Sequence, residues 1–308
     1  MEFLSLIKKY LGILLIPVAR AYIRFSPIRL GKEKLYDKFY WRKKKYAITT
    51  KEGFKMVGHS NDFVQGYIYY FGIWEPNLTA FIKSTLIEPD RTFIDIGANV
   101  GYFTLLASQL LYKGNVVSIE AFPSIFDKLK HHVAINKCNN VRMLNIAASD
   151  EEKEIYMYHL NYNEGATTSK FDAGALNPGE TPTLVKAKPL YELLESHEVQ
   201  KVRLIKIDVE GAEYEVLKGL YPLLSSFPDD TQIIVEISPT VLSEFQIQDI
   251  VDTFKQHGFM TYKITNIYRP DYYINFHTPE APELLTELPQ SQVDVIFSRK
   301  AIGSTHDV

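Results

Sequence analysis

Residues 93–103 read Phe93-Ile-Asp-Ile-Gly-Ala-Asn-Val-Gly-Tyr-Phe103. A short apolar run that ends at Asp95 passes at once into a turn with two glycines, and an amphipathic stretch follows over 102–111. This order predicts a buried strand, a tight loop and a helix whose N-terminus faces the carboxyl end of the strand. Open parallel α/β sheets hold adenosine-type cofactors at such a junction.

The spacing of the glycines and the acid before them distinguish between cofactors. Gly97 and Gly101 enclose three residues, whereas a dinucleotide fold requires Gly-x-Gly-x-x-Gly so that backbone amides can approach a pyrophosphate. Asp95 stands where it would repel a pyrophosphate, and its carboxylate suits the amino and sulfonium groups of S-adenosylmethionine. The stretch therefore predicts a methyltransferase that uses this cofactor.

Apolar strand patterns alternate with helical patterns from about residue 91 to residue 300, and this alternation predicts a doubly wound α/β sheet. Further strands are predicted over 115–120, 141–147, 202–208, 232–237, 259–265 and 293–298. The segment 159–182 is predicted to be a loop or irregular hairpin. We divide the chain into a basic arm (1–45), a hairpin and helix that pack on the core (46–90) and the main domain (91–300).

Composition describes a folded protein in a reducing compartment. Hydrophobic residues make up 46% of the chain and charged residues 23%, whereas a disordered chain would be far less apolar. The single cysteine, Cys138, excludes an internal disulfide framework and a cysteine-rich zinc site. No histidine-rich spacing points to a metal, so we expect no bound metal and a cytoplasmic location.

Charge is distributed unevenly along the chain. Residues 1–51 hold thirteen Lys and Arg against three acids, a net charge of +10. Because the whole chain has a net charge of −3, the remaining residues carry −13. The amphipathic segment 3–25 is too interrupted to cross a bilayer. We expect it either to lie on anionic lipid at the inner face of a membrane or to pack on the sheet or a second subunit. A signal peptide, suggested by Ala19-Arg-Ala21, is disfavoured because secretion would remove access to cytosolic S-adenosylmethionine.

Four carboxylates fall at predicted strand ends: Asp95, Glu120, Asp208 and Glu236. The carboxyl ends of parallel strands share one edge of a sheet, so the four should converge on a single crevice. Burying acids side by side costs free energy unless a partner pairs them, and a cationic ligand with hydroxyls would do so. Any one of them alone could instead be a helix-capping acid.

The turn residues and a lysine add to this prediction. Gly97 and Gly101 are expected to permit unusual backbone angles and close ligand approach, and Asn99 to adopt a left-handed conformation and cap the helix. The helix N-terminus would offer amides to a ligand carboxylate. Lys206 lies within an apolar strand and requires a partner. A tight turn without a ligand is the alternative.

These motifs together resemble the FkbM family of methyltransferases. The resemblance rests on Asp95-Ile-Gly-Ala-Asn-Val-Gly101, on Leu204-Ile-Lys-Ile-Asp-Val-Glu-Gly-Ala-Glu213 and on Val216-Leu-Lys-Gly219. Shorter matches in the same order are Gly72-Ile-Trp-Glu-Pro76, Ala147-Ala-Ser-Asp150, Asn163-Glu-Gly165 and Val235-Glu-Ile237. The stretch Glu120-Ala-Phe-Pro123 departs from the family, in which proline more often follows the acid directly.

The resemblance implies a class I methyltransferase sheet with strand order 3-2-1-4-5-7-6 and an antiparallel last strand. It implies S-adenosylmethionine as methyl donor and, usually, a hydroxyl acceptor on a sugar, glycan or natural product. By position, the methionine part of the cofactor would be held by Asp95, Gly97, Asn99 and Gly101. Glu120 would hold the ribose, and Ala147 and Ala148 would border the adenine.

Methylation of a hydroxyl benefits from a base that takes its proton. Asp208 and Glu236 are the candidates, although Asp208 could equally bind the amine of the cofactor. Lys206, Glu210 and Glu213 are expected to orient the acceptor or tune the base. Glu75 is expected to reach the crevice from the N-terminal segment and is assigned to the cofactor side.

Rival functions are weaker. A nicotinamide oxidoreductase would require the glycine fingerprint, and a nucleic-acid methyltransferase would require a basic face over the crevice, so we expect no nucleic-acid partner. A non-catalytic membrane scaffold that retains the fold is the main alternative. The aromatic stretch 262–276 would suit stacking on sugar rings or packing in the core. The basic arm makes a lipid-linked or cell-surface glycan a candidate acceptor.

Overall fold

The computed structural model describes residues 2–160, 163–168 and 181–303. In this part of the chain the central sheet has the order β13-β12-β14-β11-β10-β3-β4-β5. The strands are β3 (Thr92–Ile96), β4 (Asn115–Ile119), β5 (Val141–Leu144), β10 (Val202–Ile207), β11 (Gln232–Ile237), β12 (Met260–Ile264), β13 (Glu283–Leu284) and β14 (Val293–Ser298). β3 pairs in parallel with β4 and β10, while β14 runs antiparallel to β11 and β12.

This topology confirms the predicted class I methyltransferase sheet. Counted from β5 to β12, the strands follow the order 3-2-1-4-5-7-6, and the last strand in the sequence is antiparallel. The additional strand β13 lies at the edge and pairs with β12 through two residues only. A pair of residues is too short to show the alternation from which a strand can be predicted.

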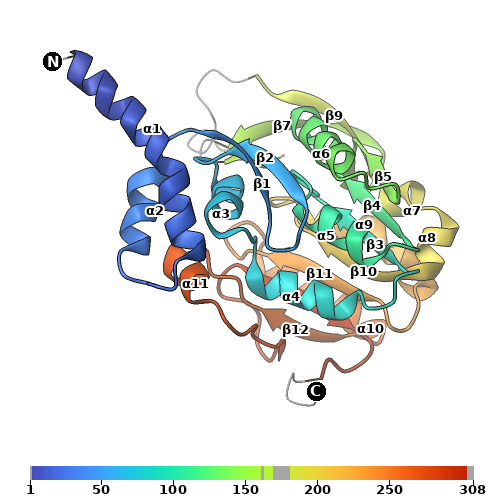
Figure 1. The fold of residues 1–308 in the computed structure, drawn as a ribbon. Helices are drawn as coiled ribbons and strands as arrows, with labels where there is room; N and C mark the ends of the chain where they lie inside the picture. Colours follow the sequence, from blue (N-terminus) through green and yellow to red (C-terminus); the bar gives the residue numbers. More distant parts are fainter. Residues whose placement is uncertain (1, 161–162, 169–180, 304–308) are drawn as a thin grey trace.

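Helices cover both faces of the sheet (Figure 1) because both faces are apolar. Neighbouring residues of β3, such as Phe93 and Ile94, belong to different hydrophobic clusters. The cluster of Phe93 includes residues of α4 (Pro76–Thr85), α5 (Tyr102–Leu110) and α6 (Pro123–Ile135). The cluster of Ile94 includes residues of α7 (Leu190–Leu193), α8 (Ser196–Lys201), α9 (Glu213–Leu220), η1 (Tyr221–Ser226) and α10 (Glu244–Gln256).

A second sheet, in the order β6-β9-β7-β8, corrects one predicted strand. Its strands are β6 (Ala147–Ser149), β7 (Lys153–Leu160), β8 (Asn163–Thr168) and β9 (Thr183–Pro189). The strand predicted over 141–147 ends at Leu144, because the Asn145 amide donates to the carbonyls of Glu120 and Ala121 and the chain then turns toward β9. A hairpin is present as β7 and β8, but its first strand begins at Lys153, before the segment 159–182 that was predicted to be a loop or irregular hairpin, and residues 169–180 lie outside the described part.

The N-terminal elements are α1 (Glu2–Phe25), α2 (Lys32–Tyr40), β1 (Lys45–Thr49), β2 (Lys55–His59) and α3 (Phe63–Phe71). The predicted hairpin is present as β1 and β2. The sequence did not predict the helices α2, α3, α8 and α11 (Pro270–Asn275), although Asp62 caps α3 by accepting from the Gln65 backbone amide at 2.8 Å. The division at residues 45 and 90 stays a prediction.

The helix α1 extends beyond the body, and α2 lies alongside it (Figure 1). Pro17 lies inside α1. Across the described ranges, no helix combines the length and hydropathy that crossing a bilayer requires.

Gly219 explains why one motif of the resemblance needs a glycine. A Cβ at this position of α9 would lie 2.0 Å from the carbonyl oxygen of Ser149 and 3.1 Å from Pro189 Cα. The helix therefore rests directly on the backbones of β6 and β9. This contact holds the second sheet beside the central one.

We predict that Gly219→Ala destabilises the protein by about 1–3 kcal/mol through overpacking, a loss larger than the about 1 kcal/mol that alanine gains over glycine in a helix. Urea unfolding measures this. Gly303→Ala is the control, because nothing lies within 4 Å of the added methyl group. Equal stability of the two variants would contradict the prediction.

Candidate active site

A pocket of about 310 Å³ opens at the carboxyl ends of β3, β4, β10 and β11. Of the thirteen residues that the sequence assigned to the site, all but Gly101 and Glu213 line it: Glu75, Asp95, Gly97, Asn99, Glu120, Ala147, Ala148, Lys206, Asp208, Glu210 and Glu236. Gly101 is not among the lining residues and instead precedes α5 with a φ of 92°. The predicted convergence of strand-end carboxylates on one crevice is thus confirmed.

Both glycines of the turn have the unusual backbone angles that were predicted, and packing requires both. Gly97 has a φ of 77°, and a Cβ there would lie 1.7 Å from the carbonyl oxygen of Asp208. A Cβ at Gly101 would lie 2.6 Å from Leu129 Cδ1. The loop after β3 therefore sits directly against the loop after β10, which brings the two acidic motifs together.

Asn99 adopts the predicted left-handed conformation, with a φ of 51°. The prediction that it caps the helix is wrong. Its Oδ1 accepts from the adjacent Val100 amide at 2.7 Å, and α5 begins after Gly101 without a side-chain cap. Asn99 instead links the turn to β4, because its backbone N–H donates to Glu120 Oε2 at 2.9 Å.

Glu120 ties the ends of two strands together. It is buried, and its second oxygen, Oε1, accepts from the Phe122 amide at 2.9 Å. Burial raises the pKa of this carboxyl to about 7, although both backbone hydrogen bonds oppose the rise. Each oxygen retains a further lone pair with which it can accept a ligand hydroxyl.

Asp95 presents a buried oxygen without a partner. Its Oδ2 accepts from the Thr104 hydroxyl at 2.6 Å, whereas Oδ1 has no hydrogen-bond partner among the described residues. Burial raises the pKa of Asp95, and the charge of Lys206 opposes that rise. An unpaired buried carboxylate oxygen is costly, so this position favours a ligand that carries a positively charged donor.

Lys206 is the cation among the described residues that line the pocket. It is buried, its Nζ lies 2.8 Å from Asp208 Oδ2, and it stands 5.2 Å from the ring centre of Phe103. Burial alone would lower its pKa, but the charges of Asp208, Asp95 and Glu75 outweigh burial and raise it. The prediction that this buried lysine has a partner is confirmed.

Glu236 lines the pocket beside an acid that the sequence did not reveal. Glu236 Oε1 accepts from Gln292 Nε2 at 2.6 Å, and burial together with the charges of Asp208 and Asp294 raises its pKa well above the usual value. Asp294 lies opposite Glu236 in the ladder between β11 and β14. It is buried, it accepts from the Asn266 amide group, and burial raises its pKa to about 7. The sequence signal that could have revealed Asp294 is its charge within the apolar run 293–298.

Glu75 enters the pocket from the segment before α4. It is buried in a left-handed conformation with a φ of 40°, and its Oε1 accepts from the Tyr268 hydroxyl at 2.6 Å. Burial and the charge of Asp294 raise its pKa to about 8. A non-glycine residue in this conformation is strained, and such strain concentrates at functional sites.

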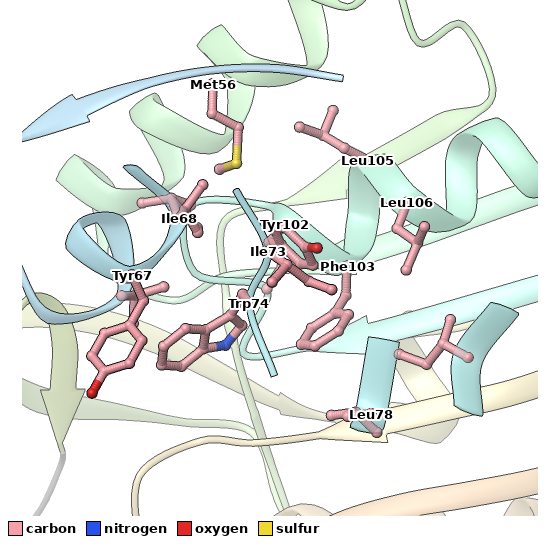
Figure 2. Packing of buried hydrophobic residues seen from close by; sticks show 14 of the residues in the cluster. Met56, Tyr67, Ile68, Ile73, Trp74, Leu78, Tyr102, Phe103, Leu105 and Leu106 are labelled. Carbon is pink, nitrogen blue, oxygen red and sulfur yellow. The ribbon is translucent and has the colours of Figure 1, made fainter. Parts of the chain in front are cut away.

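Aromatic side chains form the wall next to Glu75. The rings of Trp74 and Tyr268 stack at 5.3 Å with an interplanar angle of 23°, and both line the pocket. Figure 2 shows Trp74 in one buried cluster with Tyr102 and Phe103. Within the aromatic stretch 262–276, Tyr262 and Tyr273 are core residues, so the stretch serves mainly packing and only Tyr268 lines the pocket.

The acids after β10 have different surroundings. Glu213 is buried, and its Oε1 accepts from the amides of Val209 and Gly211, so it closes its own turn and does not line the pocket. Glu210 lines the pocket from an exposed position with a φ of 54°. Among the described residues, no group of three or more His, Cys, Asp or Glu side chains is arranged to hold a metal ion.

Known proteins resemble the part of the chain that builds this pocket. The model of a family described as "Methyltransferase FkbM domain" matches residues 95–261. "Hexuronic acid methyltransferase AglP" from Haloferax volcanii is 31% identical over 150 residues, which cover 49% of this chain and 57% of that protein. "Methyltransferase 1" from Beauveria bassiana is 25% identical over 151 residues, 43% of this chain and 59% of that protein. The chain thus matches less than two thirds of these relatives.

A solved structure, "Methyltransferase FkbM from Methylobacillus flagellatus KT", also resembles the chain. The two share 12% sequence identity with a TM-score of 0.43. The match covers 68% of this chain and 44% of the other.

The buried acids predict how stability depends on pH. Because the pKa of Glu75 is raised in the folded chain, the folded state holds a proton that the unfolded state releases between about pH 4.5 and pH 8. Stability should therefore fall as pH rises through this window. Glu75→Gln retains an oxygen that can accept from Tyr268 and removes the titration, so it should flatten the fall by about 1 kcal/mol or more.

Urea unfolding of the ligand-free protein at a series of pH values measures this slope. Glu120 and Asp294 contribute in the same direction, so part of the fall remains in the variant. Glu287→Gln, at an exposed position, is the control. Parallel curves for Glu75→Gln and the wild type would show that Glu75 does not titrate in this range.

Proposed function

The chain belongs to the FkbM methyltransferase family, whose methyl donor is S-adenosylmethionine, and from this membership we propose that it methylates a hydroxyl group of a sugar, glycan or natural product. The observation that carries the proposal is the position of the family match. Residues 95–261 include Asp95, Glu120, Asp208 and Glu236, which line one pocket. The part of the chain that matches the family therefore contains the four strand-end acids of the pocket.

The residues of the pocket fit the cofactor. Asp95 offers a buried oxygen without a hydrogen-bond partner in the described structure, which suits a cationic donor. Asp95, Gly97 and Asn99 would hold the methionine part, Glu120 would accept from the ribose hydroxyls, and Ala147 and Ala148 would border the adenine. Gly101 would contribute indirectly, by allowing α5 to begin close to the pocket. When bound, S-adenosylmethionine supplies a methyl group on a positively charged sulfur.

Positioning the acceptor and removing its proton are tasks for the other end of the pocket. Asp208 is held in an ion pair with Lys206, so this pair is suited to orient an acceptor hydroxyl. Glu236 accepts from the neutral amide group of Gln292, and burial together with the neighbouring acids raises its pKa, so it takes up a proton more readily than an ordinary carboxylate. We assign proton removal to Glu236 and orientation to Asp208, with Glu210 at the rim.

Two features support a sugar-like acceptor. A relative that is 31% identical is named for the methylation of a hexuronic acid. In this chain the stacked rings of Trp74 and Tyr268 line the pocket next to the acids. Sugars combine apolar ring faces with hydroxyl edges, and an aromatic wall beside carboxylates suits both surfaces.

We predict that Asp95→Asn weakens binding of S-adenosylhomocysteine, the product form of the cofactor, by about tenfold or more, because it removes the charge that faces the donor amine. Calorimetric titration measures the affinity. Asp127→Asn is the matched control, since the Asp127 side chain is 70% exposed and does not line the pocket. A wild-type chain that is folded and does not bind would favour the non-catalytic scaffold.

We predict that Glu236→Gln lowers kcat by about 10²- to 10⁴-fold while leaving cofactor affinity unchanged. In the wild type, kcat/KM should rise with pH as Glu236 ionises, because its pKa is raised and the base must be deprotonated to accept. The variant should lose this rise. If Asp208→Asn abolishes the pH dependence and Glu236→Gln retains it, the two roles are exchanged.

A further inference from the structure

The helical hairpin formed by α1 and α2 exposes an apolar stripe that the rest of the fold does not use. Leu14, Val18 and Phe25 are 71%, 64% and 67% exposed, and Ala21 lies exposed between them. These four positions are four, three and four residues apart, so they follow one line along the helix. The same spacing continues in the sequence at Leu11 and Ile7.

The opposite side of α1 accounts for its attachment to the body. Ile16, Ala19 and Ile23 are buried, and at 100° per residue they face away from the exposed stripe. Arg20 also attaches the helix to the body, because its Nε donates to the Tyr69 carbonyl at 2.7 Å. The helix is therefore docked by one face and leaves a second apolar face outward.

More apolar side chains are exposed where the hairpin turns and where it ends. Ile28 and Leu30, between α1 and α2, are 59% and 85% exposed, and Trp41, directly after α2, is 79% exposed. Tryptophan is enriched at the interface between lipid and water, where its ring is half apolar. An apolar surface of this kind on one small element marks a place of contact.

Positive charge accompanies this apolar surface. Lys34 and Lys38 on α2 are exposed, as are Lys43 and Lys45 after it. Residues 1–51 carry a net +10, so two copies that met through their arms would bring like charges together, whereas anionic lipid would neutralise them. Arg20, Arg24 and Lys32 are not part of this surface, because they donate to backbone carbonyls of the fold.

We propose that the α1–α2 hairpin docks on an anionic lipid surface, with the stripe Leu14–Phe25 and Trp41 entering the interfacial layer. The 24-residue helix α1 then lies on the membrane and does not cross it. Because the side chains of the stripe are exposed, lipid can reach them without displacing the core.

Vesicle flotation of the full chain tests the proposal. The wild type should float with vesicles that contain phosphatidylglycerol, much less with pure phosphatidylcholine, and less at high salt. Leu14→Ser/Phe25→Ser should reduce flotation by about tenfold or more. Phe245→Ser is the matched control, since Phe245 on α10 is 74% exposed and should not matter.

A pair of charge-reversal variants completes the experiment. Lys34→Glu should weaken flotation on anionic vesicles, and Lys255→Glu, on the exposed face of α10, should not. Binding of S-adenosylhomocysteine by each variant is compared with the wild type to separate loss of docking from loss of fold. Absence of flotation by a folded wild type, or light scattering that shows a dimer which Leu14→Ser/Phe25→Ser dissociates, would overturn the proposal.

Discussion

The ammonium of Lys206 is the charge on which the pocket depends. Asp208 lies 2.8 Å away, and Asp95 and Glu75 are near enough to raise the pKa of the lysine. Removing one partner of a buried pair typically costs about 3–5 kcal/mol, because the other charge is left unpaired. The surrounding acids outnumber this cation, and the surplus is relieved by raised carboxyl pKa values. A bound cation would reduce this surplus of negative charge further, so the site favours a positively charged ligand.

Close contact between loops makes this arrangement rigid. The turn at Gly97 rests on the Asp208 carbonyl, and Asn99 donates to Glu120. Three strand ends are thereby joined, and a side chain at residue 97 would prevent the contact with the loop after β10. A site held in this way meets a ligand with groups already in position, which reduces the entropy that binding and reaction must overcome.

The N-terminal elements serve the site and extend beyond it. The segment after α3 brings Trp74 and Glu75 to the pocket, where Tyr268 from the far end of the chain closes the same wall. The hairpin α1–α2, in contrast, contacts α3 and leaves its apolar stripe outward. One end of the chain thus completes the pocket and also presents a surface that the proposed docking would place against lipid.

The sequence by itself determined the central sheet, the glycine turn after β3 and the strand-end acids that line the pocket. Strand and helix periods are local, and the position of Asp95, Glu120 and Asp208 at strand ends is visible once the strands are recognised. The tertiary structure alone decided the partners that come from distant segments. Tyr268 meets Glu75 across 193 residues, and Asp294 faces Glu236 because β14 inserts antiparallel beside β11. It also decided that Gly97 faces a carbonyl and that the strand after 141 ends at Leu144, since both follow from contacts between elements and not from local pattern.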